Sequence, residues 1–222
     1  IALKSNIDSA TIKHLTPKEV LFEGGRNITL TGAEERLESY YVYGKYGIEA
    51  CYTDVGMAVK LADSISGVVV GEDGGYIWRK GNRSLRNQIM AIQGEKESEE
   101  RGSLAICLDT MLAYEGIVRN SEYMLKKGDS VLNILEESLE GAQILDLTGC
   151  SLDAVLYYVN RDIPVLVMMQ DGSAVLLIGI KKKNTVVMNP ESGTIYKVGM
   201  NDSTEWFEQN GNRFITYIRS EE

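Results

Sequence analysis

The sequence predicts an α+β fold in which helices precede an antiparallel sheet. The first observation is a set of short apolar segments between residues 163 and 198. Their length, β-branched content and flanking Gly and Pro residues favour buried strands over helices. The second observation is the order of the elements, because helical apolar spacing dominates residues 103–160 and strand patterns follow it. Segregated helices and strands of this kind are typical of α+β domains.

Four strands in succession form a predicted antiparallel meander. Asp171-Gly172 suits a hairpin turn between the apolar runs 163–169 and 174–180. The lysine triplet before Asn184 makes a solvated turn into a short third strand, and the sequence NPESG at residues 189–193 turns the chain again. A sheet this apolar needs helices or a second sheet to cover it.

Four helices are expected before the meander, and one is expected after it. Apolar residues recur at helical spacing in SLAICLDTMLAY, and Gly116 follows as a stop signal. An extended segment is expected at 142–147 and a last strand at 213–219. The expected helices are 103–114, 121–126, 129–139, one capped by Ser151, and one through Phe207 capped by Asn201 or Ser203.

A smaller ββαββ module is predicted before these elements. Its strands are expected near residues 40–43, 48–52, 68–70 and 76–79, with a helix capped by Thr53 between the two pairs. The highly charged sequence GEKESEERG at residues 94–102 is typical of a solvated linker. We therefore expect an N-terminal arm plus the ββαββ domain over residues 1–92, and a second domain over residues 93–222.

Composition excludes several classes of function. The net charge of −9 argues against nucleic acid as a partner, because phosphate binding needs a basic surface. No apolar run reaches the roughly 20 residues that span a bilayer, so we expect no membrane insertion of this fragment. One histidine, His14, and three widely spaced cysteines predict no metal site and no cofactor. We interpret Cys51, Cys107 and Cys150 as buried free thiols.

Two segments of the chain resemble papain-like cysteine peptidases, most closely the branch that processes bacteriocin leader peptides. Residues 103–116, SLAICLDTMLAYEG, match the second half of a motif like C-G-P-A-C-L-A-M-V-L-A-Y-Y-G at the start of the central helix. The meander, with its apolar strand, Gly-containing turn, second apolar strand and Asn189-Pro190, matches the sheet of that family. The resemblance covers roughly residues 96–219 and implies a papain-like fold for the second domain.

The same resemblance implies that the catalytic residues are missing. Ser103 stands at the position of the nucleophilic cysteine, and Glu97 stands near that of the oxyanion-hole glutamine. Ser173 stands at the position of the histidine base, so only Asn189, at the position of its partner, keeps a suitable type. We therefore expect no catalytic residues, and Ser103, Ser173 and Asn189 become candidates for lining a binding groove.

Elementary chemistry leads to the same expectation. A hydroxyl or thiol nucleophile needs a base near pKa 7, and the only histidine, His14, belongs to the N-terminal arm and would reach the second domain only if that arm folded across the groove. Cys107 falls on the apolar stripe of a helix, where a thiol stays protonated and inert. Cys150 precedes the Ser151 cap, where a helix N-terminus favours the thiolate, but it has no partner in the sequence.

The sequence thus predicts a non-catalytic, peptidase-like binding module for a peptide or a cell-surface partner. One alternative is an active hydrolase that uses Ser103 or a cysteine, and another is a structural scaffold within a larger surface protein. Because the chain begins at Ile1 without Met, we expect it to be trimmed from a bacterial extracellular or surface protein; a cytoplasmic location stays open. The sequence gives no oligomeric state and no ligand identity.

Overall fold

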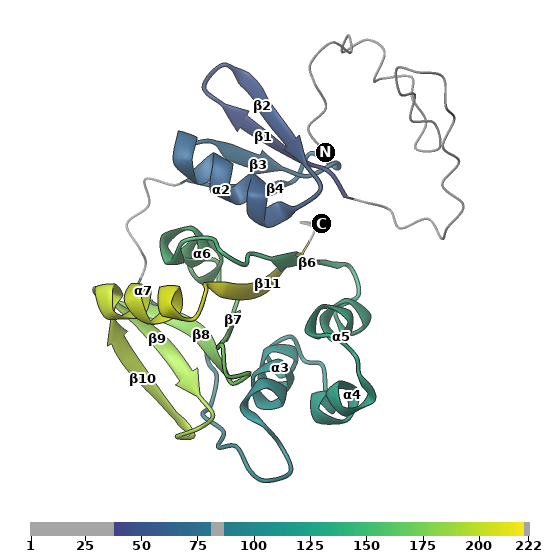
Figure 1. Ribbon diagram of the computed structural model, residues 1–222, viewed down its shortest axis with the longest axis vertical. Coiled ribbons are helices and arrows are strands. Elements are labelled where there is room, and N and C mark those ends of the chain that lie inside the picture. The colour runs from purple at the N-terminus through teal and green to yellow at the C-terminus, as the bar shows by residue number, and fades with distance from the viewer. Residues whose placement is uncertain (1–37, 81–86, 220–222) are drawn as a thin grey trace. The chain divides into compact units, whose positions relative to one another are not determined.

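The computed structural model describes residues 38–80 and 87–219 (Figure 1). The sequence of the N-terminal arm also predicts a helix start at Thr16-Pro17 and a short strand at 26–30; both segments, like His14, lie outside the described residues. None of the helices in the described ranges is both long and apolar enough to cross a membrane.

The predicted ββαββ order is confirmed. The sheet runs in the order β2-β1-β3-β4 with antiparallel pairing throughout, and α2 packs against it. Alternation along β1 buries Val42 toward the helix, whose Ala58 and Val59 are also fully buried. Asp54, rather than the expected Thr53, caps α2, because its side chain accepts from the Met57 N–H at 2.9 Å. The elements are β1 (Tyr40–Gly44), β2 (Gly47–Tyr52), α2 (Val55–Ile65), β3 (Val68–Val70) and β4 (Tyr76–Arg79).

The larger sheet contains the predicted meander as four consecutive antiparallel neighbours, β7 to β10. The order is β10-β9-β8-β7-β11-β6, and the short β5 pairs with β8. Gly179 allows this last pairing, since a Cβ there would lie 2.5 Å from the Gln88 carbonyl oxygen. The strands are β5 (Gln88–Ile89), β6 (Ala142–Asp146), β7 (Val165–Met168), β8 (Ala174–Lys181), β9 (Asn184–Asn189), β10 (Thr194–Gly199) and β11 (Arg213–Arg219).

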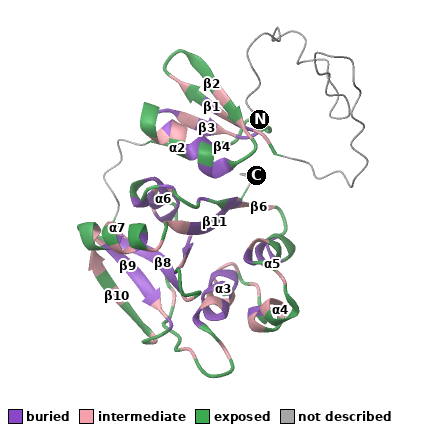
Figure 2. Ribbon diagram, viewed as in Figure 1, coloured by how far each residue is buried: buried purple, intermediate pink, exposed green. Residues whose placement is uncertain are grey.

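Helices cover both sides of this sheet. Figure 1 shows α3 and α6 on either side of β7 and β8, and both helices contact these two strands. Every residue of β8 from Ala174 to Ile180 is therefore buried (Figure 2). The helices are α3 (Ser103–Tyr114), α4 (Ser121–Lys127), α5 (Val131–Ser138), α6 (Leu152–Val159) and α7 (Met200–Gln209).

Two predicted helix starts have different outcomes. Ser151 caps α6 as expected, because its hydroxyl accepts from the Ala154 N–H at 3.2 Å. The expected caps of α7 were wrong, since the helix already begins after Gly199 and includes both Asn201 and Ser203. The Ser203 hydroxyl is instead buried and lies 2.6 Å from that of Thr185, where it joins α7 to β9.

Buried polar contacts join the small sheet to α6. The Trp78 indole N–H donates to the Ala154 carbonyl at 2.9 Å, and the Tyr158 hydroxyl donates to the Ile77 carbonyl at 3.2 Å. The domain boundary expected at residue 92 stays a prediction, and β5, which precedes it, belongs to the larger sheet.

The expectation for the cysteines was right for two of three. Cys107 and Cys150 are buried, whereas Cys51 is exposed because it lies on β2, the edge strand of the small sheet. Burial raises the pKa of Cys107 above its usual range, and it raises the pKa of Cys150 to about 12, which offsets the opposing effect of Lys60. Neither thiol is activated by its surroundings.

These buried groups predict a loss of stability in alkali. Cys107, Cys150 and Tyr158 stay protonated in the fold above the pH at which the unfolded chain releases their protons. Above about pH 9, each thiol is expected to remove up to about 1.4 kcal/mol of unfolding free energy per pH unit. Urea unfolding at pH 7, 9 and 10 measures how steeply the unfolding free energy falls with pH. Cys107→Ala should make this fall shallower by the contribution of one thiol, up to about 1.4 kcal/mol per pH unit. A flat profile would contradict the burial of these thiols.

Candidate functional site

Ser103 begins α3 and is 6% exposed. Its hydroxyl oxygen accepts a hydrogen bond from the Ala174 N–H at 3.1 Å, in a buried contact between the helix and the start of β8. The residue at the nucleophile position therefore lies next to the residue that follows Ser173, as the resemblance implies. The Ser103 hydroxyl acts here as a structural acceptor.

Ser173 closes the β7–β8 turn. Its N–H and its hydroxyl both donate to the Asp171 carboxylate, at 2.9 and 2.7 Å, in a local turn of the kind that aspartate favours. The Ser173 hydroxyl, with the Ser173 N–H as a second donor, lowers the pKa of Asp171. Ser173, at the position of the base, is thus a hydrogen-bond donor to the exposed Asp171 carboxylate.

Asn189 and Glu97 meet at the β9–β10 turn. The Asn189 side-chain oxygen accepts from the Glu191 N–H at 2.9 Å, and its amide donates to the Tyr196 hydroxyl at 3.4 Å. The Glu97 N–H donates to the Pro190 carbonyl at 2.8 Å. Leu176 on β8 pairs with Met188 on β9, and these residues lie two positions from Ala174 and Pro190, respectively. All four positions named by the resemblance therefore gather at one end of the sheet.

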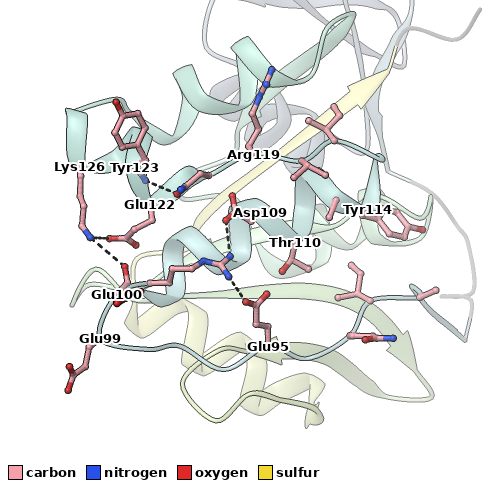
Figure 3. A pocket seen from close by; sticks show the side chains of 18 residues that line it. Glu95, Glu99, Glu100, Asp109, Thr110, Tyr114, Arg119, Glu122, Tyr123 and Lys126 are labelled. Atoms are coloured by element: carbon pink, nitrogen blue, oxygen red, sulfur yellow. Dashed lines mark hydrogen bonds and ion pairs between the residues drawn. The ribbon is translucent and has the colours of Figure 1, made fainter.

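A cleft of about 1030 Å³ opens along the second half of α3, which contributes Asp109, Thr110, Ala113 and Tyr114 to its lining. Figure 3 shows it between the extended segment 91–101, α3 and α4. Ser103, Ser173 and Asn189 are absent from its lining. The lining consists of Ala91, Ile92, Gln93, Glu95, Glu99, Glu100, Arg101, Asp109, Thr110, Ala113, Tyr114, Ile117, Val118, Arg119, Asn120, Glu122, Tyr123 and Lys126.

Ion pairs hold the cleft's charged end together. Arg101 pairs with both Glu95 and Asp109, the latter at 2.8 Å, and so ties the extended segment to α3. Glu122 accepts from the Gly102 N–H at 3.0 Å and pairs with Lys126 at 3.0 Å. The Gly102 N–H, followed by Lys126, lowers the pKa of Glu122. Each pair is partly exposed, so its role is to position the walls more than to stabilise the fold.

Sequence reasoning missed this cleft. The charged sequence predicts a solvated linker at 94–102, and this segment does lack helix and strand. It is nevertheless anchored: a Cβ on Gly94 would lie 2.5 Å from the Gly193 carbonyl oxygen, and Glu97 bonds to Pro190. The available signal was the alternation of glutamates with Lys96 and Arg101, a pattern that also allows specific ion pairs.

Removal of the Ser103 hydroxyl is expected to destabilise the protein. Ser103→Ala leaves the buried Ala174 N–H without its acceptor, which costs about 1–3 kcal/mol of unfolding free energy. Ser173→Ala is the matched control, since its hydroxyl bonds only to the exposed Asp171, and it should cost less than about 1 kcal/mol. Urea unfolding measures both. Equal losses for the two variants would contradict the structural role of Ser103.

Comparison with known proteins shows a similarity of fold and no match at the level of sequence. No protein-family profile matches the sequence, and no curated protein matches it significantly. Among solved structures, a C39-like peptidase from Bacillus anthracis superposes with a TM-score of 0.52 at 16% identity, covering 62% of this chain and 100% of that one.

Two further structures were found at lower similarity. A double glycine motif protease from an AMS/PCAT transporter, solved with its leader peptide, gives a TM-score of 0.42 at 17% identity over 60% of this chain and 94% of its own. The N-terminal C39-like domain of a toxin secretion ATP-binding protein from Vibrio parahaemolyticus gives a TM-score of 0.41 at 16% identity, over 54% of this chain and 98% of its own. From the first of the three structures, this chain has the papain-like α+β fold of a C39-like peptidase.

Proposed function

We propose that this protein uses a peptidase fold to bind a peptide, free or displayed on a cell surface, without cleaving it. The observation that carries the proposal is the use of both key hydroxyls as structural groups. Ser103 accepts from the Ala174 N–H, and Ser173 donates to Asp171. A peptidase would need these positions for a nucleophile and its base.

The chemistry of the surrounding groups supports the proposal. A serine hydroxyl becomes nucleophilic only when a positioned base removes its proton. Within residues 38–80 and 87–219 there is no histidine, and no lysine hydrogen-bonds to the Ser103 hydroxyl. The two buried cysteines have raised pKa values, so they do not supply a thiolate near neutral pH.

Active-site probes and peptide selection together test the proposal. In a Cys51→Ser background, which removes the exposed thiol, a fluorophosphonate probe and a peptidyl vinyl sulfone are expected to leave the protein unlabelled. A phage-displayed random peptide library is expected to yield binders with Kd below about 100 µM, a range typical of weak recognition. Stoichiometric labelling of Ser103 would contradict the non-catalytic assignment, and failure to enrich any peptide would favour a scaffold.

A further inference from the structure

The cleft beside α3 has an apolar end. Ile92, Tyr114 and Ile117 are half-buried and pack against the core, and each presents part of its surface to the cleft. Val118 is 89% exposed in the same lining. A solvent-exposed aliphatic side chain beside three half-buried apolar ones makes a site for an apolar group rather than for a polar one.

The other end of the cleft is acidic. Figure 3 shows Glu99 and Glu100 at the end away from Tyr114, with Glu95 between the two ends. Among the described residues, the carboxylates of Glu99 and Glu100 have no hydrogen-bond or ion-pair partner, whereas Glu95 is paired with Arg101. Two negative charges are thus available to a ligand at this end.

The positive charges of the lining are already engaged. Arg101 lies between Glu95 and Asp109, and Lys126 pairs with Glu122. The Arg119 side chain points away from the cleft (Figure 3), and its Nε donates to the Ser138 hydroxyl at 3.3 Å. Carboxylates outnumber cations in the lining, so its net charge is negative, like the net charge of −9 of the whole chain.

The cleft is large enough to hold several side chains of a peptide segment. Its volume of about 1030 Å³ lies at the upper limit of the roughly 300–1,000 Å³ that small-molecule sites span. An elongated site with an apolar end and an acidic end complements a segment that carries apolar and basic side chains in sequence.

We propose that this cleft binds a short peptide segment in which apolar residues adjoin lysines or arginines. The inference rests on the proposed function and specifies the class of its ligand. The apolar residues of the ligand lie against Ile92, Tyr114 and Val118. Its basic residues lie at Glu99 and Glu100, where charge complementarity fixes the direction of the bound chain.

Three fluorescein-labelled peptides of eight residues test the ligand class by fluorescence anisotropy. The first has two leucines followed by three lysines, the second replaces the lysines by glutamates, and the third replaces the leucines by serines; glycines fill the remaining positions. The first peptide is expected to bind at least about tenfold more tightly than either of the others, since each lacks one of the two complementary features.

Variants of the protein locate the site. Glu99→Lys with Glu100→Lys reverses the two unpaired charges and is expected to weaken binding of the first peptide about tenfold or more. Glu136→Lys with Glu137→Lys, on exposed positions of α5 outside the cleft, makes the same change in net charge and should alter binding less than about twofold. Ala113→Trp, which fills the exposed apolar end, is expected to weaken binding about tenfold as well.

The outcomes separate this inference from the proposed function. Equal effects of the two charge reversals, or equal affinity for the lysine and glutamate peptides, would overturn the cleft assignment. If peptides selected from the random library bind but ignore all cleft variants, the inference fails while the proposed function stands. If no peptide binds at all, both fail.

Discussion

Replacement of three side chains, in the variant C51S/S103C/S173H, is expected to give a thiol that reacts rapidly with iodoacetamide. The hydrogen bond from the Ala174 N–H to the Ser103 hydroxyl places position 103 against the residue that follows position 173. An imidazole at position 173 would then form an ion pair with a thiol at position 103 and lower its pKa. At pH 7 the alkylation rate is expected to rise about tenfold or more over C51S/S103C, because the thiolate fraction rises from a few per cent toward one.

Mass spectrometry of the labelled peptides assigns the reactive site. Cys107 and Cys150 remain buried and protonated, so they should stay unlabelled in the folded protein. C51S/S173H serves as the control for reactivity from any other thiol. If the imidazole leaves the rate unchanged, positions 103 and 173 do not face each other, and the implied catalytic arrangement is wrong for this chain.

Trp78→Ala is expected to lower the unfolding free energy by about 3–5 kcal/mol. The indole is 2% exposed, its N–H donates to the Ala154 carbonyl at 2.9 Å, and its ring lies 6.3 Å from that of Tyr157. The substitution leaves a cavity between β4 and α6 that the surrounding helix and strand only partly fill. Urea unfolding followed by circular dichroism and by Trp206 fluorescence measures the loss.

Tyr76→Ala is the matched control on the same strand. Tyr76 is 62% exposed, so its removal should change the unfolding free energy by less than about 0.5 kcal/mol. Because Trp78 joins the small sheet to α6, the Trp78→Ala substitution is expected to move the unfolding transition to lower urea concentration. The shift should be equal by circular dichroism and by the fluorescence of Trp206 in α7. A Trp206 transition that stays in place in Trp78→Ala would mean that the small sheet unfolds independently.

The arrangement of the strands was predictable because it depends on local signals. Asp171-Gly172 and the NPESG turn fixed the meander, and the period of the apolar residues in 103–114 matched α3 to the residue. The pairing of β11 between β7 and β6 was not predictable, since no local pattern specifies which distant strand a segment joins. The exposure of Cys51 was missed because an apolar neighbourhood in sequence does not reveal an edge strand.

The candidate site was predictable in part for a similar reason. The resemblance named Ser103 and Ser173 through motifs that are contiguous in sequence, and the Ser103 hydroxyl contacts Ala174, the residue that follows Ser173. The cleft depends on contacts between segments far apart, such as Glu122 with Gly102 and Glu97 with Pro190. A run of charged residues does not by itself reveal which of its members will be fixed by partners elsewhere in the chain.

The anchoring of the extended segment before α3 has a consequence for cleavage. Gln88 is held by strand pairing with Ile180 on one side of the exposed Glu99 and Glu100, and Arg101 is held by Asp109 on the other. A single backbone break between the two glutamates would separate the chain into two fragments without releasing either from its contacts. The fragments would remain together as a noncovalent complex until denaturant is added, so an intact size in solution would not prove an uncut chain.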